Sequence, residues 1–160
     1  MADRAVVILH SGQTGVERGA HHGAIASGLP VRGFMRSERR DELGPLPDEI
    51  AGMLAPCGDG GQRAAVLATL ALATAVVVVV PEIRSAVRKR SATWILRYAR
   101  AKSLPHWLCD GATSVTDVAT WYAQLAPAAD HHILVTGPRA TRWREGETVA
   151  RRLVKALALL

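Results

Sequence analysis

The sequence predicts an α/β domain with three layers and a mostly parallel sheet. Short apolar runs suited to strands alternate along the chain with longer segments in which apolar residues recur at helical spacing. One of these runs, AVVVVV at residues 75–80, contains no polar residue, which is typical of a parallel strand covered on both faces. The 160 residues are enough for one domain, spanning 1–160, with a core of its own.

Five strands are expected, each an apolar run bounded by polar or turn-forming residues. The first ends in a turn that contains two glycines, and the third stops at Pro81. The second is the weakest of the set. In chain order the strands are residues 4–10, 31–35, 75–80, 105–109 and 132–136.

Helices are expected between and after these strands. Thr14 and Glu17 have the spacing of a capping box at the start of the first helix, and Ser114 and Asp117 have it at the start of the fifth. Pro47 suits the first turn of the second helix. The third helix is apolar nearly all round, so we expect it to be buried. In chain order the helices are residues 14–27, 46–54, 62–73, 91–103, 114–126 and 145–159.

Basic residues gather in three places. The formal net charge is +6 and the pI is about 10.1. Half of the 20 Lys and Arg residues fall in the segments 36–44, 81–91 and 137–144, and each segment follows a predicted strand, as does the glycine turn at 11–15. The carboxyl ends of parallel strands share one edge of the sheet, so these segments should converge there and form a cleft for an anionic ligand.

The turn HSGQTGVER, residues 10–18, is the candidate ligand-binding segment. Gly12 and Gly15 permit a positive φ or the close approach of a ligand, and the first N–H groups of the following helix can bind an anion. The turn is neither a P-loop nor a GxGxxG fingerprint, and a tight turn that binds nothing is the alternative. Glu17 has two interpretations: a cap of the helix, or a catalytic carboxylate that faces the cleft.

Arginines in two of the basic segments are candidates for binding the anion. Arg39 and Arg40 are neighbours, so in an extended chain only one of them can reach a ligand. Arg139 follows the turn Gly137-Pro138, and its guanidinium suits bidentate recognition of phosphate or carboxylate. The alternatives are a solvated loop whose arginines pair with neighbouring acids, and a surface arginine without a role.

Neither the cysteines nor the histidines have the spacing of a metal site. Cys57 and Cys109 lie far apart, which indicates reduced thiols rather than a disulfide or a zinc site. The rings of His21 and His22 should point apart on a helix, and those of His131 and His132 should do the same at the start of the last strand. We therefore expect no metal ligands. His10 ends the first strand and is a candidate ligand contact.

The sequence also predicts where the protein resides. Residues 1–9 lack the basic start, apolar core and cleavage site of a signal peptide. The apolar stretch at 64–80 approaches the length of a membrane span, but an Ala/Leu-rich part followed by a valine run favours a helix that leads into a buried strand. We therefore expect a cytoplasmic protein with no membrane segment.

Five motifs follow one another along the chain: SGQTGVERG, RRDELGPLP, QRAAVLATLALATAVVVV, SATWILRYARAKSLPHW and HILVTGPRAT. In this order they resemble the molybdenum cofactor carrier family and, more distantly, the nucleotide-binding proteins of the lysine-decarboxylase-like (LOG) superfamily. The matching positions are Gly12, Gln13, Thr14, Gly15, Arg18, Arg39, Arg40, Gln62, Arg63, Gly137, Pro138 and Arg139. We add Ser11 to the candidate cofactor-binding residues because it opens the turn.

The resemblance implies a Rossmann-like fold, a homo-oligomer and a small-molecule anionic ligand. The ligand is then the molybdenum cofactor or a nucleotide-like phosphate compound, and the protein is its carrier. The chain departs from the family pattern before the helix at 92, where Lys89, Arg90 and Ser91 replace a glycine-rich turn. One alternative is a nucleotide N-glycosidase in which Glu17 assists departure of the base, although the relatives' PGGxGTxxE signature is absent. Another is a nucleic-acid-binding protein that uses the basic residues of 84–90.

Overall fold

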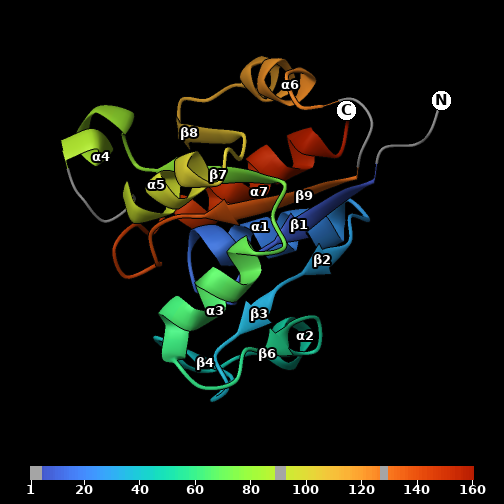
Figure 1. The fold of residues 1–160 in the computed structure, drawn as a ribbon. Coiled ribbons are helices and arrows are strands. Elements are labelled where there is room, and N and C mark those ends of the chain that lie inside the picture. The colour runs from blue at the N-terminus through green and yellow to red at the C-terminus, as the bar shows by residue number, and fades with distance from the viewer. Residues whose placement is uncertain (1–4, 89–92, 127–129) are drawn as a thin grey trace.

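The computed structural model describes residues 5–88, 93–126 and 130–160. Its centre is a five-stranded sheet with the order β2-β1-β9-β7-β8 (Figure 1). All neighbouring strands are parallel, so their carboxyl ends lie at one edge. The strands are β1 (Val6–Leu9), β2 (Val31–Arg32), β7 (Ala75–Val80), β8 (His106–Asp110) and β9 (His131–Thr136). The predicted α/β fold with a mostly parallel sheet is confirmed.

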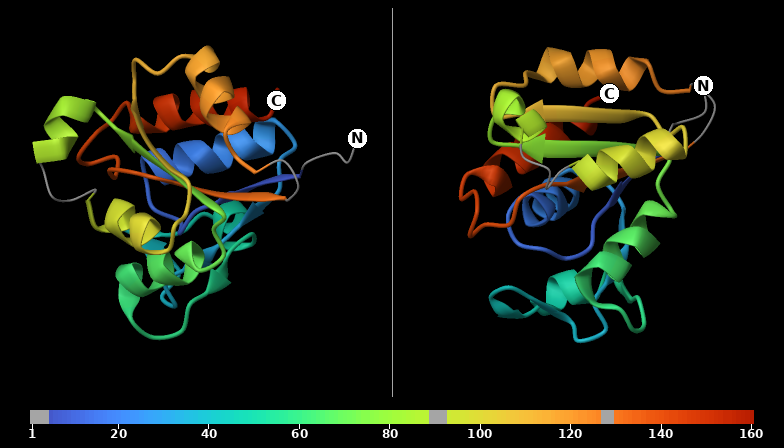
Figure 2. Two further views of the ribbon diagram at one scale, coloured as in Figure 1. Left: turned by 45° about the horizontal axis from the view of Figure 1, so that its top comes forward. Right: turned by 60° about the vertical axis from the view of Figure 1, so that its left-hand side comes forward.

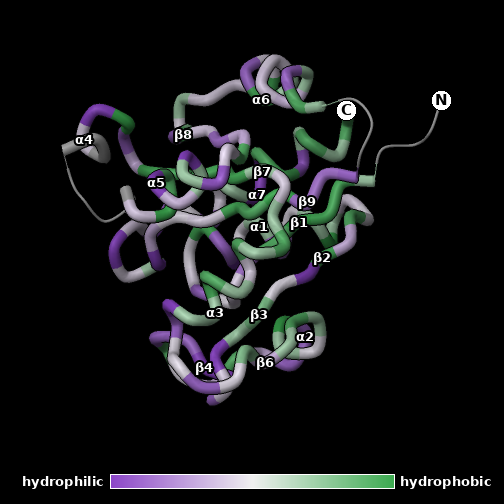
Figure 3. Tube along the Cα trace, viewed as in Figure 1, coloured by the Kyte–Doolittle hydropathy of each residue, from purple (hydrophilic) through white to green (hydrophobic). Residues whose placement is uncertain are grey.

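Helices cover both faces of this sheet and complete the three layers (Figure 2). Alternate strand residues point to opposite faces, so Ile8 and Val77 pack in one core cluster while Leu9 and Val78 pack in the other. All six residues of β7 are buried, as its valine run predicts, and the strand is mostly green in Figure 3. The first face carries α1 (Val16–Ala26), α6 (Val115–Ala123) and α7 (Gly146–Leu157), and the second carries α3 (Gly61–Leu70) and α5 (Thr93–Ala101).

The small residues of α1 bring this helix against α7. A Cβ atom on Gly19 would lie 2.1 Å from the carbonyl oxygen of Glu147, and one on Gly23 would lie 2.8 Å from that of Arg151. Val16 and the alanines of α1 lie in the core cluster shared with the sheet. The small-residue face predicted for this helix therefore serves two contacts, one with the sheet and one with α7.

The predicted strand at 31–35 is divided at Gly33. This glycine has a φ of 144°, and a Cβ atom there would lie 2.0 Å from the carbonyl oxygen of His10, so only glycine allows the chain to leave the sheet here. The next residues form a small unit beside α3, built on a core of Met35, Leu46, Ile50 and Leu54 (Figure 1). Its elements are β3 (Phe34–Met35), β4 (Arg40–Asp41), β5 (Gly44–Pro45), α2 (Asp48–Ala51) and β6 (Ala55–Pro56).

Some local predictions are confirmed and others are wrong. Ser114 and Asp117 form the predicted capping box of α6. The capping box predicted for α1 is wrong, because the N-cap is Gly15 and no side chain caps it. The third helix is buried on one side only, since Leu67 is 39% exposed.

Two features lie between β7 and β8. Helix α4 (Ile83–Arg88) lies in the basic segment 81–91, where we predicted no helix before residue 91. The predicted start of the following helix at Ser91 lies outside the described residues, as do Lys89 and Arg90.

No helix in the described ranges is both long and apolar enough to cross a membrane.

Candidate functional site

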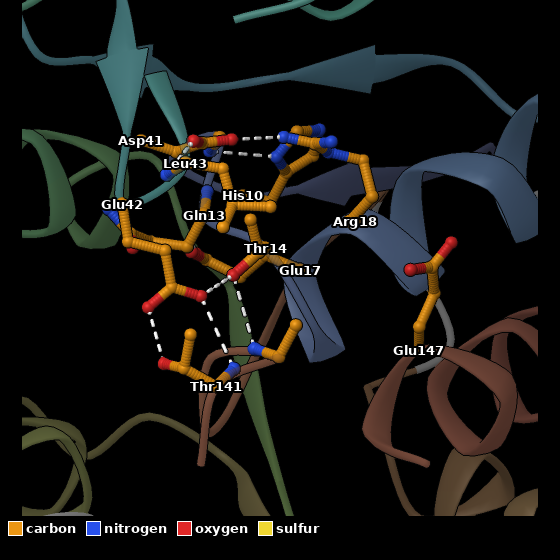
Figure 4. A network of polar contacts seen from close by, with 12 residues as sticks. His10, Gln13, Thr14, Glu17, Arg18, Asp41, Glu42, Leu43, Thr141 and Glu147 are labelled. Atoms are coloured by element: carbon orange, nitrogen blue, oxygen red, sulfur yellow. Dashed lines mark hydrogen bonds and ion pairs between the residues drawn. The ribbon is translucent and has the colours of Figure 1, made fainter. Parts of the chain in front are cut away.

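Three segments meet at the carboxyl edge of the sheet: the glycine turn after β1, the hairpin formed by β4 and β5, and the turn after β9 (Figure 4). The Arg18 guanidinium donates to Asp41 Oδ2 at 2.6 Å, which ties α1 to the hairpin. The Thr14 hydroxyl donates to the Glu42 carboxylate, and Glu42 accepts another hydrogen bond from Thr141 Oγ1 at 2.6 Å. The convergence is therefore confirmed for three of the four segments that we predicted to meet here. The structure describes the fourth, 81–91, only to residue 88.

Glu17 folds back onto the turn that precedes it. One carboxylate oxygen accepts hydrogen bonds of 3.0 Å from both the N–H and the hydroxyl of Ser11, and the other accepts one of 3.2 Å from the N–H of Gln13. Burial raises the pKa of the Glu17 carboxyl, and the bonds from Ser11 and Gln13 with the charge of Arg139 offset only part of this effect. Glu17 is 2% exposed, so its carboxylate holds the shape of the turn and does not face solvent.

His10 supports the same turn from inside the protein. Its Nδ1 accepts a hydrogen bond from the N–H of Gly12 at 3.0 Å, and its Nε2 lies 3.0 Å from Nδ1 of His21. Because Nδ1 is an acceptor, we place the proton on Nε2, which donates it to His21. Burial and nearby positive groups lower the pKa of His10 to about 3 and that of His21 to about 4, so both rings are neutral at pH 7. The predicted contact of His10 with a ligand is wrong, because the residue is fully buried.

Most N–H groups of the turn are hydrogen-bonded within the protein. The N–H groups of Ser11, Gly12 and Gln13 donate to Glu17 and His10, and the N–H of Val16 donates to the carbonyl of Pro138 at 3.3 Å. Side chains from α1 and from the end of β1 therefore take up the donors of the turn, and the turn after β9 takes up the first N–H of the helix. Within the described residues, the N–H groups of Thr14 and Gly15 have no hydrogen-bond partner. The side-chain Oε1 of Gln13 is likewise buried without a partner among these residues.

The glycines of the site have the predicted conformation. Gly12 and Gly15 have φ values of 85° and 76°. A Cβ atom on Gly15 would lie 2.5 Å from the carbonyl oxygen of Pro138, and one on Gly137 would lie 2.2 Å from that of Val79. A Cβ atom on Gly12 would meet leucine side chains of the small unit around α2. All three glycines therefore permit close contact between segments of the protein itself.

The candidate arginines are exposed at this edge. Arg39 has a φ of 52°, so the chain is not extended there and the predicted alternation with Arg40 does not apply. Neither they nor Arg139 form an ion pair within the part of the chain that the structure describes. The charge of Arg139 favours the ionised forms of both Glu17 and Glu42.

The remaining predicted positions form no hydrogen bond or ion pair with this network among the described residues. Arg63 stacks over the ring of Trp94, 4.8 Å from its centroid, and the polar side-chain atoms of Gln62 are buried with no hydrogen-bond partner among the described residues. Arg84 on α4 is exposed. Within the described ranges no three His, Cys, Asp or Glu side chains are grouped to hold a metal ion.

Sequence reasoning missed three residues whose hydrogen bonds join the three segments. Asp41 and Glu42 were considered only as partners of the neighbouring arginines, and Thr141 was not considered. Their partners Arg18 and Thr14 lie 23 and 28 residues away, and Thr141 lies 99 residues from Glu42. No local pattern identifies contacts of such separation.

The order of the strands indicates the origin of this arrangement. Counted from β9, the sheet reads 3-2-1-4-5, the order of the strands in a nucleotide-binding doubly wound sheet. A family model described as "Circularly permutated YpsA SLOG family" matches residues 8–158. The chain belongs to this family. The match confirms the family resemblance drawn from the motifs, and the last strand of this SLOG protein stands where an unpermuted sheet has its first.

A solved structure has the same fold as this SLOG protein. It is the crystal structure of a "Putative molybdenum carrier protein" from Syntrophus aciditrophicus SB, with a TM-score of 0.78 and 21% sequence identity. The alignment covers 96% of this chain and 94% of that chain. No curated protein matches the sequence.

The topology also locates the switch point of the sheet. The chain after β9 leads to α7 on one face, whereas the chain after β7 leads to α5 on the other. Ligands of doubly wound sheets bind in the crevice at this point, outside the carboxyl ends of the strands. In this SLOG protein the turn Gly137-Pro138-Arg139 borders that point, and Thr14 lies beside it through the hydrogen bond from Ala140 N–H to its hydroxyl, 3.1 Å long.

Proposed function

We propose that this SLOG protein binds a small anionic ligand that carries a phosphate, at the carboxyl edge of the sheet beside β9. The observation that carries the proposal is the meeting of the glycine turn, the arginine-rich hairpin and the turn after β9 at this edge. Arg139 and Arg39 or Arg40 supply positive charge, since these arginines are exposed and form no ion pair in the described part of the chain. The N–H groups of Thr14 and Gly15, which have no hydrogen-bond partner among the described residues, add donors, while Ser11, Gly12, Gln13, Gly137 and Pro138 shape the turns.

The molybdenum cofactor is the named candidate, and a nucleotide is the alternative within the same proposal. The name of the structural neighbour supports the first, and the nucleotide-type strand order supports the second. Both compounds present a phosphate ester to the arginines. We propose a carrier role, with a homo-oligomer in the cytoplasm as the working form.

Catalysis by Glu17 has less support than binding. A general acid must reach the leaving group, but Glu17 is buried and its oxygens accept hydrogen bonds from the turn. The nucleic-acid alternative rests on residues 84–90, which the structure describes only to 88.

The first experiment identifies the ligand. Mass spectrometry of small molecules that co-purify with the protein, with metal analysis of the same sample, should detect a phosphate-bearing compound. Mononucleotides, dinucleotides and pterin phosphates should then raise the melting temperature, because a ligand that binds the native state stabilises it. No shift with any of them at millimolar concentration would contradict the proposal.

The second experiment tests the role of Arg139. Arg139→Ala should weaken binding by about 1.5–3 kcal/mol, the usual range for a hydrogen bond to a charged group, or roughly ten- to hundredfold in Kd. The matched control is Arg144→Ala, which removes the same charge from an exposed position in the same segment. Equal affinities for both variants would remove Arg139 from the site.

A further inference from the structure

The Glu42 carboxylate lies among donors that suit an anion. It accepts hydrogen bonds from the hydroxyl of Thr14, from Thr141 Oγ1 at 2.6 Å and from the N–H of Thr141 at 3.4 Å. The N–H of Ala140 donates to the Thr14 hydroxyl oxygen at 3.1 Å, which leaves the hydroxyl proton for Glu42. Figure 4 shows this carboxylate between the turn after β1 and the turn after β9.

The electrostatics match this geometry. Burial opposes ionisation of Glu42, but the hydrogen bonds from Thr14 and Thr141 and the charge of Arg139 outweigh it, so the pKa of this carboxyl is lowered. Glu42 is therefore an anion at neutral pH. Two hydroxyls, a backbone N–H and a guanidinium also form a donor set that proteins use for phosphate.

We propose that Glu42 occupies an oxyanion site of this protein, and that a tetrahedral oxyanion or a phosphate ester binds to Thr14, Thr141 and Arg139 after the Glu42 side chain has moved out. The inference rests on the proposed function, because it assigns the phosphate of that ligand to this position. It adds that the Glu42 carboxylate competes with the ligand for these donors.

The packing of the hairpin allows the Glu42 side chain to move while its neighbours stay in place. Asp41 is anchored by Arg18, and its side chain is only 3% exposed. Leu46 is buried in the small core on the other side of the hairpin. Between these anchors Leu43 is 74% exposed, so the tip buries little apolar surface. Rotation of the Glu42 side chain therefore breaks its three hydrogen bonds and leaves the packed residues in place.

The test measures affinity for inorganic phosphate and for AMP by calorimetry at low salt. Glu42→Ala should bind phosphate about tenfold or more tightly than the wild type, because the competing charge is gone. Glu42→Gln should show the same direction, since an amide is a weaker competitor for these donors. Glu38→Ala is the matched control: it removes one negative charge from the same segment without contact to Thr14 or Thr141. Circular dichroism and melting curves establish that each variant is folded.

A double variant tests whether the added phosphate affinity depends on the Thr141 hydroxyl. Glu42→Ala with Thr141→Val should lose most of the added phosphate affinity, because valine has the shape of threonine without the hydroxyl donor. Equal phosphate affinities for Glu42→Ala, Glu38→Ala and the wild type would overturn the inference, and AMP binding by the wild type would then leave the proposed function standing. Tighter phosphate binding by Glu42→Ala, without binding of any nucleotide or pterin phosphate by either protein, would support the oxyanion site and contradict the proposed function.

Discussion

Replacing His10 by asparagine tests how the turn after β1 is held in shape. His10 accepts the N–H of Gly12 and donates to His21, and both rings are neutral in the core. Asparagine retains an acceptor for Gly12, since its side chain often accepts the backbone N–H two residues on. It cannot take up a proton as the ring does. The substitution therefore removes a titrating group and keeps the contact with the turn.

The expected effect on stability follows from the lowered pKa. The ordinary pKa of histidine is 6.5 and that of His10 is about 3, so as the pH falls below 6.5 the unfolded chain takes up the proton first. Stability from this group is thus present above pH 6.5 and is lost as the pH falls toward 3. One pH unit corresponds to about 1.4 kcal/mol, so His10 should cost the wild type about 2 kcal/mol at pH 5. The pKa of His21 is also lowered, so this residue adds a further loss of stability on acidification.

The wild type and the variant must be compared at each pH, because Glu17 has an opposite effect on the pH dependence of stability. Its raised pKa means that the folded state binds the proton more readily, so acidification stabilises the protein through this group. The wild type alone would report the sum of opposing effects. The difference between wild type and His10→Asn cancels the part that both proteins share.

Urea unfolding at pH 7.5 and pH 5 provides the measurement. The stability advantage of the wild type over His10→Asn should shrink by about 2 kcal/mol between the two pH values. His132→Gln is the control, because this residue on β9 takes no part in the pair with His21. Parallel loss of stability in the wild type and His10→Asn would refute the assignment of a neutral, buried His10.

Four further predictions concern helix packing, the turn after β1, catalysis and nucleic acid. Gly19→Ala should lower the free energy of unfolding by about 1–3 kcal/mol, because the new Cβ would meet the carbonyl of Glu147 and push α1 from α7; an unchanged urea midpoint would contradict the packing. Glu17→Gln should lower the free energy of unfolding by about 1–3 kcal/mol. The amide nitrogen of glutamine cannot accept a hydrogen bond, so the N–H of either Ser11 or Gln13 loses its acceptor. Release of base from AMP, followed by chromatography, should stay at the buffer level for the wild type, and release that disappears in Glu17→Gln would instead support the N-glycosidase. Duplex DNA should bind weakly, with an affinity that falls steeply as salt rises in a filter-binding assay, and tight sequence-selective binding at physiological salt would favour the nucleic-acid alternative.

Features that depend on neighbouring residues could be predicted from the sequence. The valine run of β7 indicated a strand buried on both faces, and the structure confirms it. The capping box of Ser114 and Asp117 and the positive φ of Gly12 and Gly15 also follow from local chemistry. Alternation of strands and helices predicted a parallel sheet, which brings the three segments of the candidate site to one edge.

Only the tertiary structure decided how the polar groups at that edge are used. The same local pattern of Thr14 and Glu17 is compatible with a helix cap, yet Glu17 binds the turn and Thr14 binds Glu42. The choice depends on which distant groups come within reach. The strand order places the turn after β9 next to the turn after β1. Gly33 allows the chain to leave the sheet, and the segment that follows brings Glu42 to both turns. A hydrogen bond acts over about 3 Å, whereas these partners lie tens of residues apart in sequence, so their pairing is a property of the folded chain.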